Sequence, residues 1–258
     1  MGDGVGSVGR DLPRGPILFA HRGASALAPE NTLEAFRLAI ELGATGLESD
    51  VHLASDGTPV LVHDPIVRTS EGPIVVAETS AKSLRRIGIP SLADLYASCG
   101  ASLPFSLDIN DRRAVATADA VVACAHDFGA GAAALLLLCH GEVDVLTTIA
   151  SRTPEVTLVH SAERSVVARL EEHARRLSGE GVRVLNLHRR DWIVHGTADE
   201  AVATVHEAGL RAFAWDTQSA RSARVMLTAG VDAVYADDPR VLVTAWAGVD
   251  AKRRAGSA

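Results

Sequence analysis

The sequence has few of the residues that several common types of site require. Its three cysteines, Cys99, Cys124 and Cys139, form no metal-binding motif, and their odd number is typical of reduced intracellular thiols. Only two lysines occur, Lys82 and Lys252, and neither lies on an expected strand, so there is no evident Schiff-base nucleophile. No GxGxxG pattern follows the first apolar run. These absences disfavour an aldolase and a dinucleotide-binding protein.

Long apolar runs and an excess of positive charge are also missing. Residues 1–15 have neither the basic start nor the apolar centre of a signal peptide, and we predict a flexible arm over residues 1–14. The longest strongly apolar stretch, residues 130–139, is too short to span a membrane. The formal net charge of −7 provides no broad basic field for a nucleic acid. We therefore expect a cytoplasmic protein without stable membrane insertion, whose partner is a small molecule; the sequence does not set its oligomeric state.

Short runs rich in strand-forming residues alternate with segments in which apolar residues recur at helical spacing. The predicted strands are 17–22, 46–53, 104–109, 134–139, 156–160, 182–187, 211–215 and 231–235. The predicted helices between them include 31–43, 91–99, 112–128, 143–152, 162–178, 197–208 and 219–229. Eight such units in about 240 residues are the size of a (β/α)8 barrel. We predict an α/β protein with a single TIM-barrel domain over residues 15–248 and a flexible tail at 249–258.

One stretch interrupts this alternation after the second predicted strand. Between residues 57 and 90 we predict an extra strand that carries His63, followed by a small insertion over about 65–90. Such an insertion would lie over the mouth of the barrel.

Four residues stand at the ends of short apolar runs: His21, Glu48, Asp50 and His63. In this kind of barrel the catalytic residues lie at the carboxyl ends of the strands. Alternation along the second strand directs Glu48, Asp50 and His52 to one face, which must point inward because the opposite, apolar face packs against helices. This layout predicts a two-histidine acid–base site around a divalent metal ion.

Two inward carboxylates repel each other and are costly to desolvate, so they require a cation or protons. Asp108 ends the third predicted strand as a possible third oxygen ligand, with Asn110 next on the same face. Ligation by oxygen alone favours Mg²⁺ or Ca²⁺ over Zn²⁺. The alternative is that Glu48 or Asp50 only pairs with a barrel arginine such as Arg22.

The segments HRGASALAPENTLEAF and LESDVHLASDGTPVLVHDP resemble the glycerophosphodiester phosphodiesterase family. The resemblance continues through IPSLADLY and the GLRAFAWDT and GVDAVYADDP segments, from about Ile17 to Val243. The ordered set of His-Arg-Gly, Glu-Asn-Thr, Glu-x-Asp and His-Asp at these spacings is what makes it specific.

The resemblance implies a TIM-barrel hydrolase that cleaves glycerophosphodiesters to an alcohol and glycerol phosphate with a divalent metal. It implies that His21 and His63 are the acid–base pair, that Glu48 and Asp50 bind the metal, and that Arg22 contacts the phosphate. Glu30, in the Glu-Asn-Thr motif, would orient the metal site or that arginine, or would belong to a helix cap.

The expected reaction needs a group that removes a proton and another that returns one. We hypothesise that the metal lowers the pKa of the glycerol 2-hydroxyl, that one histidine takes its proton, and that attack gives a cyclic phosphate. The second histidine protonates the departing alcohol, and water then opens the ring.

The sequence departs from the family pattern at two places. Asp108 and Asn110 stand where the family has Glu-x-Lys, so the ligand is shorter and an amide replaces a positive charge only in part. Trp215 and Asp216 begin the segment that is Trp-Thr-Val-Asn in the family. We expect Trp215 to form a wall of the substrate pocket and Asp216 to add negative charge near it.

Two further hypotheses remain from the sequence. One is a related barrel phospholipase D that acts on lysophospholipids or sphingolipids, with residues 73–76 and 87–89 as an apolar approach. The other is a degenerate barrel that binds a phosphorylated ligand without turnover, which the residues at 108 and 110 suggest and the two histidines argue against. Among the remaining polar residues, His52 either takes a direct part in the site or only lines the mouth of the barrel. We expect Asp237 and Asp238 to cap the final helix.

Overall fold

The computed structural model describes residues 12–13, 15–194 and 196–256, so most of the predicted arm at 1–14 lies outside the described residues. Eight parallel strands form a closed barrel in the order β1, β11, β10, β9, β8, β7, β6, β2, and pairing of β1 with β2 closes it. The barrel strands are β1 (Ile17–Ala20), β2 (Gly46–Leu53), β6 (Phe105–Asp108), β7 (Leu136–His140), β8 (Thr157–Ser161), β9 (Val184–His188), β10 (Arg211–Trp215) and β11 (Ala233–Ala236). The predicted TIM barrel is confirmed, and each strand begins and ends within two residues of its predicted bounds.

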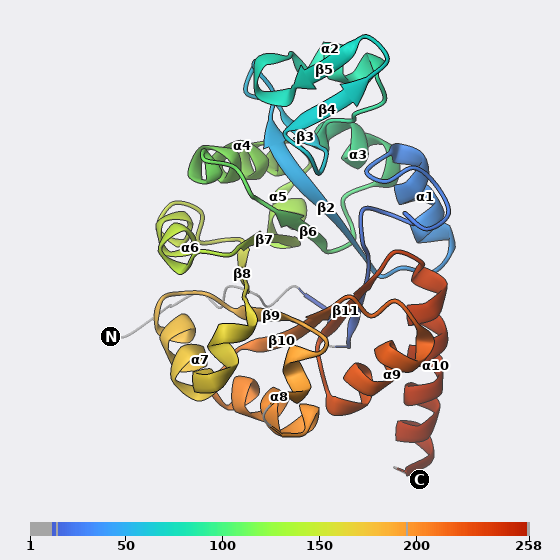
Figure 1. Cartoon of the computed structure of the whole chain (residues 1–258), viewed down its shortest axis with the longest axis vertical. Coiled ribbons are helices and arrows are strands. Elements are labelled where there is room, and N and C mark those ends of the chain that lie inside the picture. Colours follow the sequence, from blue (N-terminus) through green and yellow to red (C-terminus); the bar gives the residue numbers. More distant parts are fainter. Residues whose placement is uncertain (1–11, 14, 195, 257–258) are drawn as a thin grey trace.

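Helices surround this barrel, as Figure 1 shows. The α-helices outside the insertion are α1 (Leu33–Glu41), α3 (Leu92–Cys99), α4 (Ala114–Asp127), α5 (Ala130–Ala134), α6 (Val143–Ala150), α7 (Leu170–Gly179), α8 (Ala198–Glu207), α9 (Ala220–Ala229) and α10 (Pro239–Gly256). Short 3-10 helices, η2 (Arg164–Arg169) and η3 (Asp191–Ile193), precede α7 and α8. The apolar faces of the helices pack on the outward side chains of the strands and form the larger core.

The interior of the barrel has an apolar base below a polar mouth. The ring of Phe19 stacks on that of Tyr235 with centroids 4.6 Å apart, and Phe213 packs beside both. Gly46 is required at this level, because a Cβ there would lie 2.6 Å from Cγ2 of Ile17. The base of the barrel is therefore tightly filled with side chains.

The segment after β2 forms the insertion at the top of Figure 1. It contains β3 (Pro59–Leu61), which runs antiparallel to β2, a hairpin of β4 (Ile66–Thr69) and β5 (Gly72–Val75), the short η1 (Val76–Glu78), and α2 (Ala81–Arg86). The prediction that His63 lies on the extra strand is wrong, because the strand ends two residues before it. β3 ends at Leu61, and His63 lies in the loop that follows.

Where the structure describes the tail that was predicted to be flexible at 249–258, α10 continues to Gly256, so residues 249–256 are helical. Arg254 and Asp250, one turn apart, form an ion pair of 2.8 Å, and the Arg253 guanidinium lies 5.5 Å from the centroid of the Trp246 ring. These contacts extend the helix beyond the barrel. Among the described residues, no helix combines the length and apolar character needed to cross a membrane.

Candidate active site

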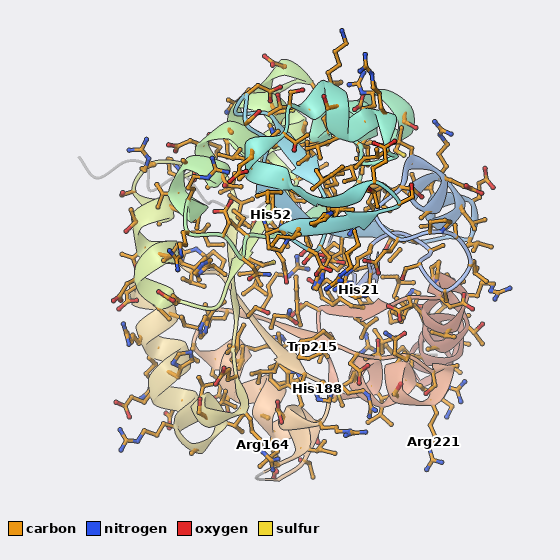
Figure 2. The ribbon with its side chains drawn as sticks, turned by 45° about the horizontal axis from the view of Figure 1, so that its top comes forward. His21, His52, Arg164, His188, Trp215 and Arg221 are labelled. Carbon is orange, nitrogen blue, oxygen red and sulfur yellow. The ribbon has the colours of Figure 1, made fainter. Side chains whose placement is uncertain are left out.

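A pocket of about 330 Å³ opens at the carboxyl ends of the barrel strands. Its lining includes His21, Arg22, Glu48, Asp50, His63, Asp108, Asn110 and Trp215, which are eight of the nine predicted site residues. Figure 2 shows His21 and Trp215 toward the centre of the ring and His52 nearer the insertion. The ninth, Glu30, lines a neighbouring pocket that also includes His63.

Three carboxylates meet at one side of this pocket. Parallel pairing of β2 with β6 sets Asp50 beside Asp108 in register, and Glu48 lies two residues earlier on β2. One carboxylate oxygen from each of these residues lies within 4.8 Å of the other two. The group of carboxylates can therefore hold a metal ion.

The electrostatics of the three carboxylates fit a cation. Burial raises the pKa of Glu48 well above its ordinary value; His21 lowers it, and Asp108 and Asp50 raise it further. Burial and the charge of Asp50 likewise raise the pKa of Asp108. Oδ2 of Asp50 is buried and has no hydrogen-bond partner. A divalent ion with oxygen ligands would neutralise this buried negative charge.

His21 follows β1 and faces these carboxylates. Its Nδ1–H donates to Oδ1 of Asp237 over 2.7 Å, and its Nε2 lies 3.8 Å from Oε2 of Glu48. Burial lowers the pKa of His21, but Glu48 and Asp237 together raise it to about 9. The expectation that Asp237 caps the final helix is therefore wrong; Asp238 alone accepts from a backbone N–H at that end, that of Arg240 at 3.0 Å.

His63, in the loop after β3, has a similar arrangement. Its Nδ1–H donates to Oδ1 of Asp64 over 2.7 Å. Nε2 of His52 donates to the backbone oxygen of His63 over 3.1 Å, so His52 contacts the His63 loop instead of lining the main pocket. In both His21 and His63 a carboxylate occupies Nδ1, which leaves Nε2 to exchange a proton with a bound molecule.

Arg22 connects the first loop with the carboxylates. Its backbone N–H donates to Oε2 of Glu48 at 2.9 Å, and its Nη1 donates to both oxygens of Glu30 at 3.2 and 3.1 Å. Its Nε lies 3.2 Å from Oδ2 of Asp50, although the two atoms do not have hydrogen-bond geometry. Glu30 thus orients the arginine, while Thr32 caps α1 by accepting from the backbone of Ala35. Asp50 thus lies beside Arg22 and also belongs to the group of three carboxylates. The alternative that Asp50 only pairs with an arginine therefore does not describe the whole arrangement.

The mouth beside the end of β10 carries Trp215, with 43% of its surface exposed. Its ring packs edge-on against His188, with centroids 4.6 Å apart, and Figure 2 shows the two side by side. Asp216 accepts from Nε2 of His188 at 3.0 Å and lies 3.4 Å from Nε of Arg189. The negative charge expected from Asp216 is therefore offset by its neighbours.

The sequence reasoning missed the partners of the two histidines and one pair of pocket residues. Asp237 and Asp64 hold the two histidines, and Ser161 and Asn186 line the side of the pocket formed by β8 and β9. The signal that could have found two of them is the alternation of inward and outward side chains along a strand. Followed along β9 and past the end of β11, it directs Asn186 and Asp237 inward.

Comparison with solved structures shows the same fold. A glycerophosphodiester phosphodiesterase from Thermotoga maritima superposes with a TM-score of 0.75 and 22% identity, over 90% of this chain and 99% of that one. An Oleispira antarctica phosphodiesterase, in complex with the product sn-glycerol-3-phosphate, gives a TM-score of 0.74 and 23% identity, over 92% of this chain and 97% of that one.

Sequence comparison is more specific. Human glycerophosphodiester phosphodiesterase 1 is 40% identical over 97 residues, which are 31% of this chain and 29% of the relative. The match therefore spans less than a third of that relative's length. The family model described as the glycerophosphoryl diester phosphodiesterase family matches residues 21–241, from the first site histidine to the start of α10. The chain belongs to the glycerophosphoryl diester phosphodiesterase family.

Proposed function

We propose that this protein hydrolyses glycerophosphodiesters to an alcohol and glycerol 3-phosphate, with a divalent metal ion and with His21 and His63 as the acid–base pair. One observation carries the proposal: two histidines, each with Nδ1 on a carboxylate, line one pocket with a cluster of three carboxylates. The names of the relatives support the reaction, and the product complex of the Oleispira antarctica protein supports a small-molecule substrate.

Glu48, Asp50 and Asp108 would hold the metal, and their oxygen donors favour Mg²⁺ or Ca²⁺. When bound, the ion supplies positive charge for the phosphate oxygens and lowers the pKa of a coordinated hydroxyl. Arg22 lines the same pocket and would bind another phosphate oxygen, with Glu30 fixing its orientation. Asn110 and Trp215 line the same pocket and would also contact the substrate.

The two histidines would carry the proton transfers. Nε2 of one accepts the proton of the glycerol 2-hydroxyl as that oxygen bonds to phosphorus, and the other donates a proton to the alkoxide whose bond to phosphorus breaks. The product of this step is a cyclic phosphate and a free alcohol. The roles then reverse: one histidine takes a proton from water as it attacks phosphorus, and the other returns a proton to the 2-oxygen.

We propose a cytoplasmic location. All three cysteines are free thiols in the structure, which supports a reducing compartment such as the cytoplasm.

The test is a substrate panel. Purified protein is incubated with glycerophosphocholine, glycerophosphoethanolamine or a lysophospholipid, in Mg²⁺, Ca²⁺ or EDTA, and glycerol 3-phosphate or lysophosphatidate is measured. We expect metal-dependent release of glycerol 3-phosphate that EDTA abolishes. If the folded protein cleaves no diester under any metal, the proposal is wrong and a ligand-binding barrel explains the pocket better.

A further inference from the structure

One side of the pocket has no part in the chemistry proposed above. In the closed barrel, β8 and β9 lie four strands around from β1 and β2, and therefore opposite them. Ser161 ends β8, and Asn186 stands beside it on β9. The wall with the metal ligands and His21 thus faces a wall whose two polar side chains carry no charge.

Asn186 is an unusual residue in this position. It is inward by alternation, because Leu185 and Leu187 pack in the outer core, and only 5% of its surface is exposed. Its Nδ2 is 3.5 Å from Oγ of Ser161, at the limit of a hydrogen bond, and its Oδ1 has no partner. Buried amide groups are nearly always satisfied, so an unpartnered one that lines a pocket indicates a ligand group that completes its bonding.

The chemistry of the pair selects the kind of ligand group. An amide and a hydroxyl can each donate and accept a hydrogen bond, which matches an alcohol hydroxyl. A phosphate dianion or monoanion ester offers no donor to Oδ1 of Asn186, and a quaternary ammonium offers none either. A primary ammonium can donate to Oδ1 of Asn186 but cannot accept from the amide or from Ser161, whereas an alcohol hydroxyl can do both, so an uncharged hydroxyl fits the pair best.

We propose that Ser161 and Asn186 bind the free terminal hydroxyl, at carbon 1, of the glycerol part of the substrate. This inference rests on the proposed function. The glycerol part must stay through both steps, whereas the alcohol leaves after the first. The buried pair suits the part that stays, and the open rim, where Trp215 and His63 are exposed, suits the part that leaves.

This assignment predicts which diesters are poor substrates. In a lysophospholipid with a chain on carbon 1, an ester or ether replaces the hydroxyl and has no hydrogen to donate. Oδ1 of Asn186 would stay unpaired in that complex, and a site built to bind a hydroxyl discriminates strongly against an analogue without one. Diesters of unsubstituted glycerol are therefore the substrate class.

The experiment pairs a substrate change with a residue change. Glycerophosphocholine is compared with its analogue in which hydrogen replaces the carbon 1 hydroxyl, so that the 2-hydroxyl nucleophile is kept. Both are assayed with wild type, Asn186→Ala and Ser161→Ala in the presence of metal. Thr157→Val is the matched control, because Thr157 lies at the other end of β8 and its Oγ1 is also buried without a partner.

We expect wild type and Thr157→Val to prefer glycerophosphocholine by at least about tenfold in kcat/KM, and Asn186→Ala to lose most of that preference because its kcat/KM for glycerophosphocholine falls. An unchanged preference in both Asn186→Ala and Ser161→Ala would overturn the inference and leave the proposed function intact. Calorimetry of glycerol 3-phosphate and its 1-deoxy analogue provides a second reading. If wild type cleaves neither diester, the proposed function fails. In that case, equal affinity of wild type for glycerol 3-phosphate and its 1-deoxy analogue would overturn the inference as well.

Discussion

Asp237 accepts a 2.7 Å hydrogen bond from Nδ1 of His21, although 216 residues separate the two in the chain. Pairing of β11 with β1 brings them together, because each residue directly follows its strand. We expect Asp237→Asn to lower kcat about 10- to 100-fold with little change in KM, because the imidazole loses the carboxylate that orients it. Steady-state kinetics on glycerophosphocholine measures this.

The control for that variant is Asp238→Asn. Asp238 is the next residue, but it pairs with Arg240 at 2.7 Å and not with a histidine. We expect it to keep wild-type kcat. Equal losses in the two variants would mean that the end of β11 matters only for folding.

A second prediction concerns the stability of the carboxylate cluster. Burial and Asp50 raise the pKa of Asp108, so at pH 8 its ionised form destabilises the metal-free fold. Asp108→Asn should raise the metal-free free energy of unfolding by roughly 1–3 kcal/mol. In wild type, Ca²⁺ or Mg²⁺ at about a hundredfold excess over Kd should add about 2.7 kcal/mol, and the variant should lose most of this gain.

Urea unfolding in EDTA and in metal separates the two effects. Asp127→Asn, at the exposed end of α4, serves as a control that removes the same charge elsewhere. A metal-free Asp108→Asn protein that is less stable than wild type would contradict the prediction, as would a full metal-dependent gain in that variant.

A third prediction concerns pH. Burial lowers the pKa of His160 to about 4, and His173, whose Nε2 lies 3.0 Å from Nδ1 of His160, contributes in the same direction. Between pH 6.5 and 4 the unfolded chain therefore binds more protons than the folded one, and stability falls as pH falls. His160 alone should make the protein about 2 kcal/mol less stable at pH 5 than at pH 7.

His160→Gln tests this, because glutamine does not titrate but can still donate to the backbone oxygen of Gly141, as His160 does at 3.0 Å. We expect a flatter stability curve between pH 7 and 5 for this variant, measured by urea unfolding. An unchanged slope in His160→Gln would assign the acid sensitivity to other groups.

A fourth prediction separates Arg22 from its support. The Arg22 guanidinium meets Glu30 through Nη1 and Asp50 through Nε, which a lysine cannot reproduce at the same time. We expect Arg22→Lys to lower kcat/KM by about tenfold or more, whereas Glu30→Gln, at a half-exposed side chain, costs a few-fold. The reverse order of the two effects would show that Arg22 is not a substrate contact.

The barrel could be predicted from the sequence because its signals are local. Apolar runs of strand length, helical spacing between them, and the alternation that directs Glu48 and Asp50 inward all lie within single elements. The hairpin of β4 and β5 gave a weaker signal, since its side chains are mostly exposed or half-buried and lack a clear apolar face.

The contacts that complete the site depend on closure of the barrel and on the loops. Asp237 stands beside Asp238 and before a proline, a pattern that also suits a helix cap, and only the β1–β11 pairing shows its partner. The role of His52 depends on where the backbone of His63 passes. Alternation could place Asn186 inward, but its unpaired oxygen is visible only with its neighbours in place.

The most direct test of the account follows the phosphorus of glycerophosphocholine by NMR in the presence of metal, with wild type, His21→Ala and His63→Ala. We predict that wild type releases glycerol 3-phosphate and that each histidine variant, folded and with metal affinity unchanged, is slower by at least about a hundredfold. If either variant released glycerol 3-phosphate at the wild-type rate, the two-histidine mechanism would be contradicted.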